Sequence, residues 1–438
     1  MGRQEEEELR KKVKIGLLGL GTVGSGVYRI LTEGNTILTQ KAGMDLEVDR
    51  ILVRNPDRKR RVDVESDLLT TDPEMILNNP DISIVVEVLG GEEPARTYIE
   101  KALRAGKQVV TANKEVIAKH GVELLKMARE EGVDLFFEAS VAGGIPILRP
   151  LQESLAGEDV EAVYGIVNGT TNYMLTAMDK QGLDFAEVLA DAQERGYAEA
   201  DPTADIAGHD AARKLAILAS IAFNTRVPLD KVYCTGIEKI TAADIAGAAE
   251  LGYVIKLLAI ARRVKGGIEA RVHPALVPQE HPLAAVEGVY NAVVVQGWAV
   301  GTLMFYGAGA GQMPTGSAVV GDVIAAAKNI ASGVQGKARV GFAPGAPVVP
   351  LEEVETRYYL RLRVVPEPGV LGVVTHLCSR EGVELVSLDI KNWGQDSANL
   401  IIRTQLVREG AFQRVLKTLK EEPRIYAVES YIRIEGEE

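Results

Sequence analysis

Residues 13–31, VKIGLLGLGTVGSGVYRIL, decide the fold of this chain. The stretch begins with an apolar strand over residues 13–18, turns through glycines and continues in a helical pattern to its end. The glycines have the spacing G-x-G-x-x-G between a strand and a helix, where a dinucleotide fingerprint requires them. A pyrophosphate is then expected at the N-terminus of the helix. The residues expected to bind the cofactor here are Gly19, Gly21, Thr22, Val23 and Gly24.

Short apolar strands recur along the next part of the chain. The expected strands are residues 46–53, 82–88, 108–111 and 135–138. Helical patterns separate them, and this alternation predicts an α/β fold with a Rossmann-type doubly wound parallel sheet. A lone fingerprint arises easily in a chain with 44 glycines, so the prediction depends on these strands.

The end of the second strand indicates which dinucleotide is bound. An NAD site usually has Asp or Glu at this place, which holds the ribose 2′-hydroxyl, whereas arginine suits a 2′-phosphate. Arg54 stands there, followed by four basic residues at 58–61. We therefore expect NADP, with NAD as the alternative cofactor. A solvated loop without a ligand would also explain these charges.

Length, charge and cysteine content restrict the class of protein. A chain of 438 residues is expected to form two or three domains. The formal net charge of −12 argues against a nucleic-acid surface. Cys234 and Cys378 cannot build a disulfide framework or a metal cluster, and a reducing cytoplasm fits them best. The charged start, MGRQEEEELRKK, does not resemble a signal peptide, and no stretch reaches ~18 apolar residues, so we expect no membrane association.

Residues 196–214, GYAEADPTADIAGHDAARK, place two charges on an apolar helix face. A helix opening at Pro202 and Asp205 has an apolar arc that also contains Asp210 and Lys214. The other residues of the arc are Ile206, Ala207, Ala211, Leu215, Ile217, Leu218 and Ile221, whereas His209, Arg213 and Ser220 mark the polar side. An inward lysine beside a carboxylate is suited to proton transfer. A buried structural ion pair, or a lysine snorkelling to water, fits the spacing equally well.

Two glycine-containing turns lie in the middle of the chain. Residues 168–172, NGTTN, offer donors and acceptors to a small polar ligand, although NGT is also an ordinary turn. Residues 307–311 precede a long apolar helix that begins at about Thr315. Their glycines suit either a backbone cradle for a cofactor or close packing.

The C-terminal residues follow the order strand, helix, strand, strand, helix, strand, which predicts a ferredoxin-like βαββαβ module. The strands are expected at residues 358–365, 383–391, 399–407 and 425–434, with helices after Gly369 and Ala411. The proline-containing residues 336–356 are expected to form a linker. The expected division is a dinucleotide-binding domain over 1–142, an α+β catalytic and dimerisation domain over 143–314, and the module over 357–438. Helix 315–335 is expected to pack back on the first domain.

Together these residues resemble the homoserine dehydrogenase family, in its monofunctional form with a C-terminal ACT domain. The family signature A-x-x-x-G…D-P-x-x-D-[ILVM]-x-G-x-D-x-x-x-K is matched over residues 192–214. The matching residues are Ala192, Gly196, Asp201, Pro202, Asp205, Ile206, Gly208, Asp210 and Lys214. The stretches GLGTVG, TANK, EASVAGGIP, NGTTNY and GAGAGQMPTGSAVVGD also match in order and spacing.

The resemblance implies the reversible reduction of L-aspartate 4-semialdehyde to L-homoserine with NAD(P)H, a step towards threonine, methionine and isoleucine. It implies that Lys214 is the general acid and base and that Asp210 orients it. By the same resemblance Glu199 and Asp205 receive the substrate ammonium group, and Lys114 of TANK lies between cofactor and substrate. Gly169 and Thr170 of NGTTNY are expected at the substrate, and Gly311 at the cofactor.

The resemblance also implies a monovalent cation, usually sodium. Its expected ligands are Glu138 and the backbone carbonyls of Val141, Gly143 and Ile145, because oxygen-only ligands suit a hard cation. An exposed strand end is the other explanation of Glu138. The module is expected to bind L-threonine where its first helix opens at Gly369, or simply to hold a homodimer or homotetramer together.

Two other functions would fit parts of this sequence. Aspartate-semialdehyde dehydrogenase would need a thiolate nucleophile, and neither Cys234 nor Cys378 lies in such a sequence. A non-enzymatic sensor of NADP and an amino acid would combine the same domains. The inward Asp210 and Lys214 argue against a sensor, since a sensor needs no proton shuttle.

Overall fold

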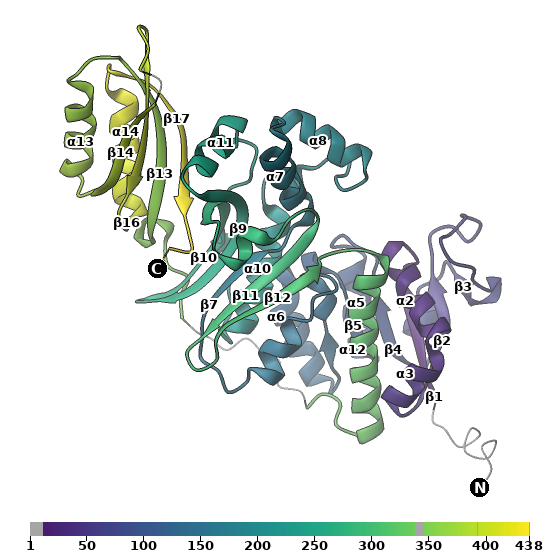
Figure 1. Ribbon diagram of the computed structural model, residues 1–438. Helices are drawn as coiled ribbons and strands as arrows, with labels where there is room; N and C mark the ends of the chain where they lie inside the picture. The colour runs from purple at the N-terminus through teal and green to yellow at the C-terminus, as the bar shows by residue number, and fades with distance from the viewer. Residues whose placement is uncertain (1–11, 338–345, 392, 438) are drawn as a thin grey trace. The chain divides into compact units, whose positions relative to one another are not determined.

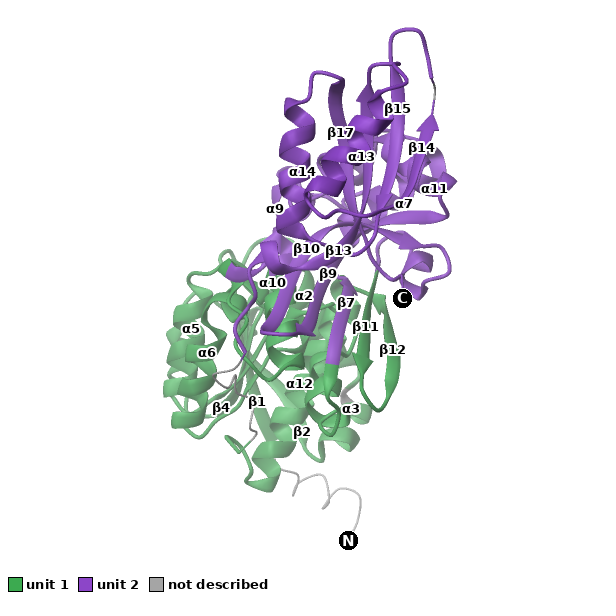
Figure 2. Cartoon of the chain, turned by 90° about the vertical axis from the view of Figure 1, so that its left-hand side faces the viewer, with its two compact units in different colours: residues 1–160, 213–230, 291–345 green, residues 161–212, 231–290, 346–438 purple. Residues whose placement is uncertain are grey.

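The computed structural model describes residues 12–337, 346–391 and 393–437. The charged start of the chain and residues 338–345 of the expected linker lie outside this description. The chain forms two compact units, coloured in Figure 2. Unit 1 comprises Met1–Val160, Arg213–Asp230 and Asn291–Gly345, and unit 2 comprises Glu161–Ala212, Lys231–Tyr290 and Ala346–Glu438. Each unit is thus built from separate stretches of sequence, and the domain boundaries expected at residues 142, 314 and 357 remain predictions.

Unit 1 contains a six-stranded parallel sheet with the order β3-β2-β1-β4-β5-β6. Its strands are β1 (Lys12–Leu18), β2 (Asp45–Leu52), β3 (Leu69–Thr70), β4 (Ile82–Glu87), β5 (Gln108–Thr111) and β6 (Leu135–Phe136). The strand order reverses between β1 and β4, so the carboxyl ends of these strands form the switch point at which such sheets bind ligands. The predicted Rossmann-type sheet is confirmed.

Helices cover both faces of this sheet, and Figure 2 shows α5 and α6 on one side and α3 and α12 on the other. The helices of unit 1 are α2 (Thr22–Glu33), α3 (Asn35–Ala42), α4 (Glu74–Leu77), α5 (Ala95–Arg104), α6 (Lys114–Glu130) and α12 (Gln312–Ser332). Strands β11 (Tyr290–Gly297) and β12 (Gly301–Ala308) precede α12. The buried core joins α2, α3 and α12 to the central strands.

Two glycines let α12 lie directly on α2. A Cβ added at Gly26 would stand 2.0 Å from the main-chain oxygen of Gln312, and one at Gly316 would stand 2.9 Å from the carbonyl carbon of Gly26. Only hydrogen atoms at these positions allow the two helices to approach so closely. The contact joins α2, the helix after the glycine loop, to a helix that begins at Gln312 rather than at the predicted Thr315.

Unit 2 contains β7 (Val160–Ile166), β8 (Tyr233–Cys234) and the long antiparallel pair β9 (Tyr253–Val264) and β10 (Gly267–Pro278), with β7 antiparallel to β9. Its helices are α7 (Gly169–Gln181), α8 (Phe185–Glu194), α9 (Thr203–Ile206) and α11 (Ala242–Glu250), while α10 (His209–Ala222) belongs to both units. Among the described residues, no helix is long and apolar enough to cross a membrane.

The C-terminal part of unit 2 has the predicted βαββαβ order, as Figure 1 shows. Its elements are β13 (Glu355–Val364), α13 (Val370–Arg380), β14 (Leu385–Lys391), β15 (Ala398–Thr404), the short β16 (Val407–Arg408), α14 (Glu409–Glu421) and β17 (Ile425–Ile434). The strands form an antiparallel sheet in the order β17-β13-β15-β14. Alternate residues of β13, from Tyr358 to Val364, pack with α13 and α14 in a separate buried core.

Strand β17 also pairs in parallel with β10, through Ala275 with Arg433 and Leu276 with Ile434. Just beyond β17, Glu435 accepts a hydrogen bond of 2.5 Å from Arg271 of β10, whose side chain is only 1% exposed. The other face of β13 contacts α11, where Arg361 bonds to Asp244 at 2.9 Å. The βαββαβ part is therefore fastened to the rest of unit 2 by backbone pairing and by buried charges. Val349 of the expected linker adds a hydrogen bond to Ile268.

Candidate active site

The glycine loop after β1 has the geometry of an anion-binding turn. Gly19 has a φ of +106°, which favours glycine, and a Cβ at Gly24 would stand 2.2 Å from the main-chain oxygen of Gly19. Gly21 differs from both, because a Cβ there would meet no atom within 4 Å. Gly21 is also the N-cap of α2 and has no side chain to accept the first N–H groups of the helix. The backbone therefore presents open space and N–H donors at a positive helix end.

The start of α12 lies against α2, through the contact of Gln312 with Gly26. Gly311, the N-cap of α12, has a φ of +129° that only glycine adopts readily. The fold thus brings Gly311 close to the second turn of α2, although the two lie far apart in the sequence. Its contact with the cofactor stays a prediction.

Arg54 is exposed in the loop that follows β2. The pairing of β2 with its neighbour continues to Val53, whose N–H bonds to the oxygen of Thr70 at 2.8 Å. Within the basic cluster at residues 58–61, Arg60 bonds to its own loop. Its guanidinium donates to the main-chain oxygens of Pro56 at 2.6 Å and Arg58 at 2.8 Å. Arg60 therefore shapes the loop on which Arg54 is carried.

Lys114 is the first residue of α6, at the carboxyl end of β5. Its loop is held by a chain of hydrogen bonds that begins at Glu87, a fully buried acid at the end of β4. Glu87 accepts from the Thr111 hydroxyl at 2.6 Å, and the Thr111 hydroxyl accepts from the N–H of Asn113 at 3.0 Å. Asn113 caps α6 at the N–H of Val116 and donates to Gly91 of the β4–α5 loop at 2.7 Å. Burial raises the pKa of Glu87.

Glu87 and Asn113 were not among the predicted site residues. The indication for Glu87 was an acid inside the apolar strand ISIVVEV, which predicts a buried carboxyl group. Asn113 was visible only as part of TANK, because its partner Gly91 lies on another loop.

Glu138 does not end a strand as expected. Strand β6 ends at Phe136, and Glu138 begins a short 3-10 turn in which it is buried. Its carboxylate accepts from the N–H groups of Ile147 at 2.6 Å, Leu148 at 2.8 Å and Arg149 at 2.7 Å. The side chain therefore binds the backbone of the loop that contains Val141, Gly143 and Ile145.

The same loop is tied to α12. Asp322 accepts from the N–H of Glu138 at 2.9 Å and from the guanidinium of Arg149. Burial raises the pKa of Asp322 to about 7, although the arginine opposes the shift. A Cβ at Gly143, where φ is +53°, would stand 2.2 Å from the main-chain oxygen of Gly309. Among the described residues, no group of three or more His, Cys, Asp or Glu side chains could hold a metal ion.

Asn168 joins two of the predicted carboxylates in unit 2. It is the N-cap of α7, and its side-chain oxygen accepts from the N–H of Thr171 at 2.9 Å. Its Nδ2 donates to Asp205 at 2.7 Å and to Asp210 at 3.0 Å. The structure thus places the start of α7, with Gly169 and Thr170, beside α9 and the start of α10.

Lys214 and Asp210 lie one turn apart on α10, and both are buried, at 9% and 4% exposed. The expected inward orientation of the two charges is confirmed. The expectation of a single helix from Pro202 is wrong, because α9 ends at Ile206 and Gly208 turns the chain with a φ of +82°.

The remaining substrate candidates lie before this helix. Glu199 is exposed, and its main-chain oxygen accepts from the side chain of Gln193 at 3.1 Å. Thr170 donates to the main-chain oxygen of Tyr197 at 2.7 Å. The segment that carries Glu199 is therefore tied to the N-terminus of α7.

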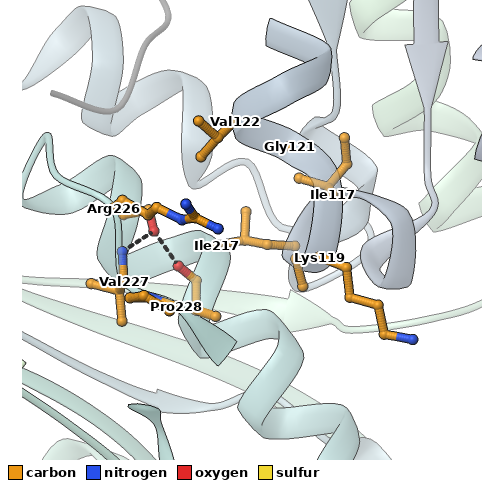
Figure 3. Close-up of a pocket in the computed structure, with 11 residues that line it drawn as sticks. Ile117, Lys119, Gly121, Val122, Ile217, Arg226, Val227 and Pro228 are labelled. Carbon is orange, nitrogen blue, oxygen red and sulfur yellow. Dashed lines mark hydrogen bonds between the residues drawn. The ribbon is translucent and has the colours of Figure 1, made fainter. Parts of the chain in front are cut away.

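A pocket in unit 1 lies between α6 and the second half of α10, and Figure 3 shows it. Its lining residues are Ile117, Ala118, Lys119, Gly121, Val122, Ala216, Ile217, Ser220, Arg226, Val227 and Pro228. Of the described residues that line it, none is a predicted site residue. Ser220 was expected on the polar side of the helix but is buried, and its hydroxyl donates to the main-chain oxygen of Ala216 at 2.6 Å and accepts from the N–H of Val227 at 3.0 Å.

Comparison with known proteins identifies relatives of the whole chain. A family profile described as homoserine dehydrogenase matches residues 146–324, and one described as homoserine dehydrogenase, NAD binding domain, matches residues 19–138. Homoserine dehydrogenase of Corynebacterium glutamicum is 48% identical over 97% of this chain and 96% of its own length. That of Bacillus subtilis is 44% identical over 97% and 99%.

Solved structures give the same result. A homoserine dehydrogenase from Thiobacillus denitrificans has a TM-score of 0.91 and 41% identity, and the match covers 97% of this chain and 98% of that chain. A hyperthermophilic archaeal homoserine dehydrogenase in complex with NADPH has a TM-score of 0.62 and 29% identity, over 72% of this chain and 98% of that chain.

Proposed function

The chain belongs to the homoserine dehydrogenase family, and from this premise we propose how its residues share the reaction. It is an NAD(P)-dependent oxidoreductase that acts on a CH–OH group, interconverting L-aspartate 4-semialdehyde and L-homoserine. The reduced nicotinamide supplies the hydride when it is bound. The chain must then hold the aldehyde and supply one proton.

Lys214 is the general acid in the direction of reduction and the general base in the reverse direction. A proton passes from its ammonium group to the carbonyl oxygen as the hydride reaches the carbonyl carbon, so that an alcohol and a neutral amine result. Proton transfer of this kind requires a lysine withdrawn from bulk water beside a carboxylate. The burial of Lys214 one turn after Asp210 is the observation that carries the proposal. Asp210 orients Lys214.

The ammonium group of the substrate is received by carboxylates. Asp205, held by Asn168, and Glu199 supply the negative charge that an ammonium group requires. Gly169 and Thr170, at the N-terminus of α7, are expected to donate backbone N–H groups to an anionic group of the substrate, because a helix N-terminus favours negative charge. Lys114 lies between cofactor and substrate and polarises the carbonyl oxygen.

NADP is the preferred cofactor, with NAD as the alternative. The proposal depends on Arg54, which is exposed two residues after the end of β2, where a carboxylate would repel a 2′-phosphate. Gly19, Gly21, Thr22, Val23, Gly24, Lys114 and Gly311 complete the cofactor site.

A monovalent cation, sodium by preference, is bound by the loop after Glu138. The ligands would be the backbone carbonyl oxygens of Val141, Gly143 and Ile145, which as oxygen donors suit a hard cation. Glu138 supports them by fixing the loop, since its carboxylate accepts three N–H groups. The cation would stiffen the loop and take no part in proton transfer.

The βαββαβ part is an ACT domain that binds L-threonine at the start of α13, near Gly369. The chain assembles as a homodimer or homotetramer. Calorimetric titration with L-threonine, together with rate measurements at millimolar threonine, tests the first statement. If threonine neither binds in the titration nor changes the rate, assembly of the oligomer becomes the better explanation of this domain.

The role of Lys214 is tested by oxidation of L-homoserine with NADP⁺, followed at the nicotinamide absorbance band. Lys214→Ala is expected to lower kcat by roughly 10²- to 10⁴-fold, with the Kd for NADPH unchanged. His209→Ala is the matched control, because His209 is exposed on the same helix. A Lys214→Ala enzyme within a factor of a few of wild type would reduce the lysine to a structural role.

A further inference from the structure

Asn168 uses both ends of its side-chain amide. It is 5% exposed, so its polar atoms depend on protein partners. Its oxygen accepts from the N–H of Thr171 at 2.9 Å and from the Thr171 hydroxyl at 2.8 Å. Its nitrogen donates to Asp205 at 2.7 Å and to Asp210 at 3.0 Å. Both N–H groups of the amide are therefore occupied by carboxylates.

The orientation of this amide follows from its partners. The main-chain N–H of Thr171 can only donate, so the amide oxygen must face α7. The nitrogen then faces the two aspartates, where two N–H donors meet two acceptors. The reversed amide would place its oxygen against the carboxylates of Asp205 and Asp210, and its NH2 group against the N–H of Thr171.

The neighbours of Asn168 give its orientation a chemical consequence. Asp205 belongs to α9 and Asp210 to α10, and Gly208, with a φ of +82°, separates the two helices. Two carboxylates brought to one point repel each other unless a donor lies between them. An amide supplies two N–H donors without adding a charge, whereas a lysine in its place would cancel the negative charge that an ammonium group requires.

We propose that Asn168 is a positioning residue of the reaction, whose amide holds Asp205 and Asp210 at a fixed separation and so places both the ammonium-binding carboxylate and the partner of Lys214. The proposal rests on the proposed function, in which Asp205 receives the substrate ammonium and Asp210 orients the lysine. Because the same amide caps α7, it also fixes Gly169 and Thr170 relative to these carboxylates.

Asn168→Asp separates this role from helix capping. Aspartate caps helices as well as asparagine does, so the N–H of Thr171 keeps its acceptor. The variant replaces the two N–H donors with an oxygen of a third carboxylate group, which repels Asp205 and Asp210. The matched control is Asp184→Asn, which exchanges the same residue types at the exposed N-cap of α8.

The test measures kcat and KM for L-homoserine and for NADP⁺ in wild type, Asn168→Asp and Asp184→Asn. Asn168→Asp is expected to lower kcat/KM for homoserine roughly 10- to 100-fold, because two charge-assisted hydrogen bonds are lost. Part of this loss is a higher KM for homoserine. The KM of Asn168→Asp for NADP⁺ stays within about twofold of the wild-type value. For the control Asp184→Asn, kcat and both KM values stay within about twofold of wild type. A lower fraction of folded enzyme would reduce kcat but leave the KM for homoserine unchanged.

An Asn168→Asp enzyme with the wild-type KM and kcat for homoserine would overturn the proposal. If this variant does not fold, Asn168→Ser provides the test, since serine also caps a helix but is too short to reach the aspartates. Its KM for homoserine must rise in the same way, and an unchanged KM overturns the proposal. Lys214→Ala, measured in parallel, separates a failure of the positioning role of Asn168 from a failure of the proposed role of Lys214. Loss of activity in Lys214→Ala without an effect of Asn168→Asp refutes only the positioning role of Asn168, whereas full activity of Lys214→Ala refutes the proposed role of Lys214 as general acid and base.

Discussion

Replacing Gly21 with alanine is expected to weaken cofactor binding without affecting folding. The φ of Gly21 is −79°, which alanine adopts readily, and an added Cβ would meet no protein atom within 4 Å. The free energy of unfolding should therefore change by less than about 0.5 kcal/mol. A bound pyrophosphate would occupy this open space, so the methyl group would keep it from the N–H groups at the start of α2. Loss of one charge-assisted hydrogen bond costs about 1.5–3 kcal/mol, which corresponds to at least a tenfold higher Kd for NADPH.

Gly26→Ala is the matched variant with the opposite outcome. Its Cβ would stand 2.0 Å from the oxygen of Gln312, whereas ordinary contact begins at 3.4 Å, so α12 must move by about 1.4 Å. Overpacking of this kind lowers the free energy of unfolding by roughly 1–3 kcal/mol. Urea denaturation and fluorescence titration with NADPH measure both quantities for both variants. An unchanged Kd in Gly21→Ala, or a loss of stability equal to that of Gly26→Ala, would refute the assignment of this space to a ligand.

Three further changes test other parts of the chain. Arg54→Asp should reduce the ratio of NADH to NADPH dissociation constants towards or below one, because a carboxylate repels the 2′-phosphate, and an unchanged ratio would exclude Arg54 as the determinant. Glu435→Gln removes a charged partner of Arg271, which is 1% exposed, and should lower the free energy of unfolding by about 3–5 kcal/mol in urea. A loss below about 1 kcal/mol would mean that Glu269, 3.2 Å from the same guanidinium, suffices. Burial lowers the pKa of Lys256 to about 8, below that of the unfolded chain, so the unfolded state binds more protons between pH 8 and 10.5. Stability relative to Lys256→Met should therefore rise by up to about 3 kcal/mol over this range in urea denaturation, and a constant difference would contradict the shifted pKa.

The sequence predicted those features that depend on short spacings. The glycine fingerprint and the alternating strands gave the parallel sheet, because hydrophobic period and turn residues act locally. The burial of Asp210 and Lys214 was predictable because the two residues lie four apart on one helix, wherever that helix begins. Its start was not predictable from the apolar pattern, since Gly208 breaks the helix and a Cβ there would stand 3.0 Å from the sulfur of Cys234.

The features that escaped prediction depend on partners that lie outside the residue's own helix or strand. Ser220 is buried because a loop residue, Val227, donates to its hydroxyl. Glu138 is drawn into a loop by three N–H groups that follow it by nine to eleven residues. The bridge from Asn168 to Asp205 and Asp210 spans about forty residues, and no local pattern indicates it.

The sharing of β17 between the βαββαβ part and β10 limits how this chain can be re-engineered. The C-terminal region cannot be exchanged as a cassette at the expected linker, because the graft must also bring a last strand that matches Ala275 and Leu276 and a carboxylate that meets Arg271. Deletion after Leu351 would expose the edge of β10 and leave a buried arginine with a partner missing. The proposed binding of an amino acid is therefore better tested by point changes near Gly369 than by removal of the βαββαβ part. Chimaeras between relatives should place their crossover before β10, so that β10 and β17, which pair with each other, come from one parent.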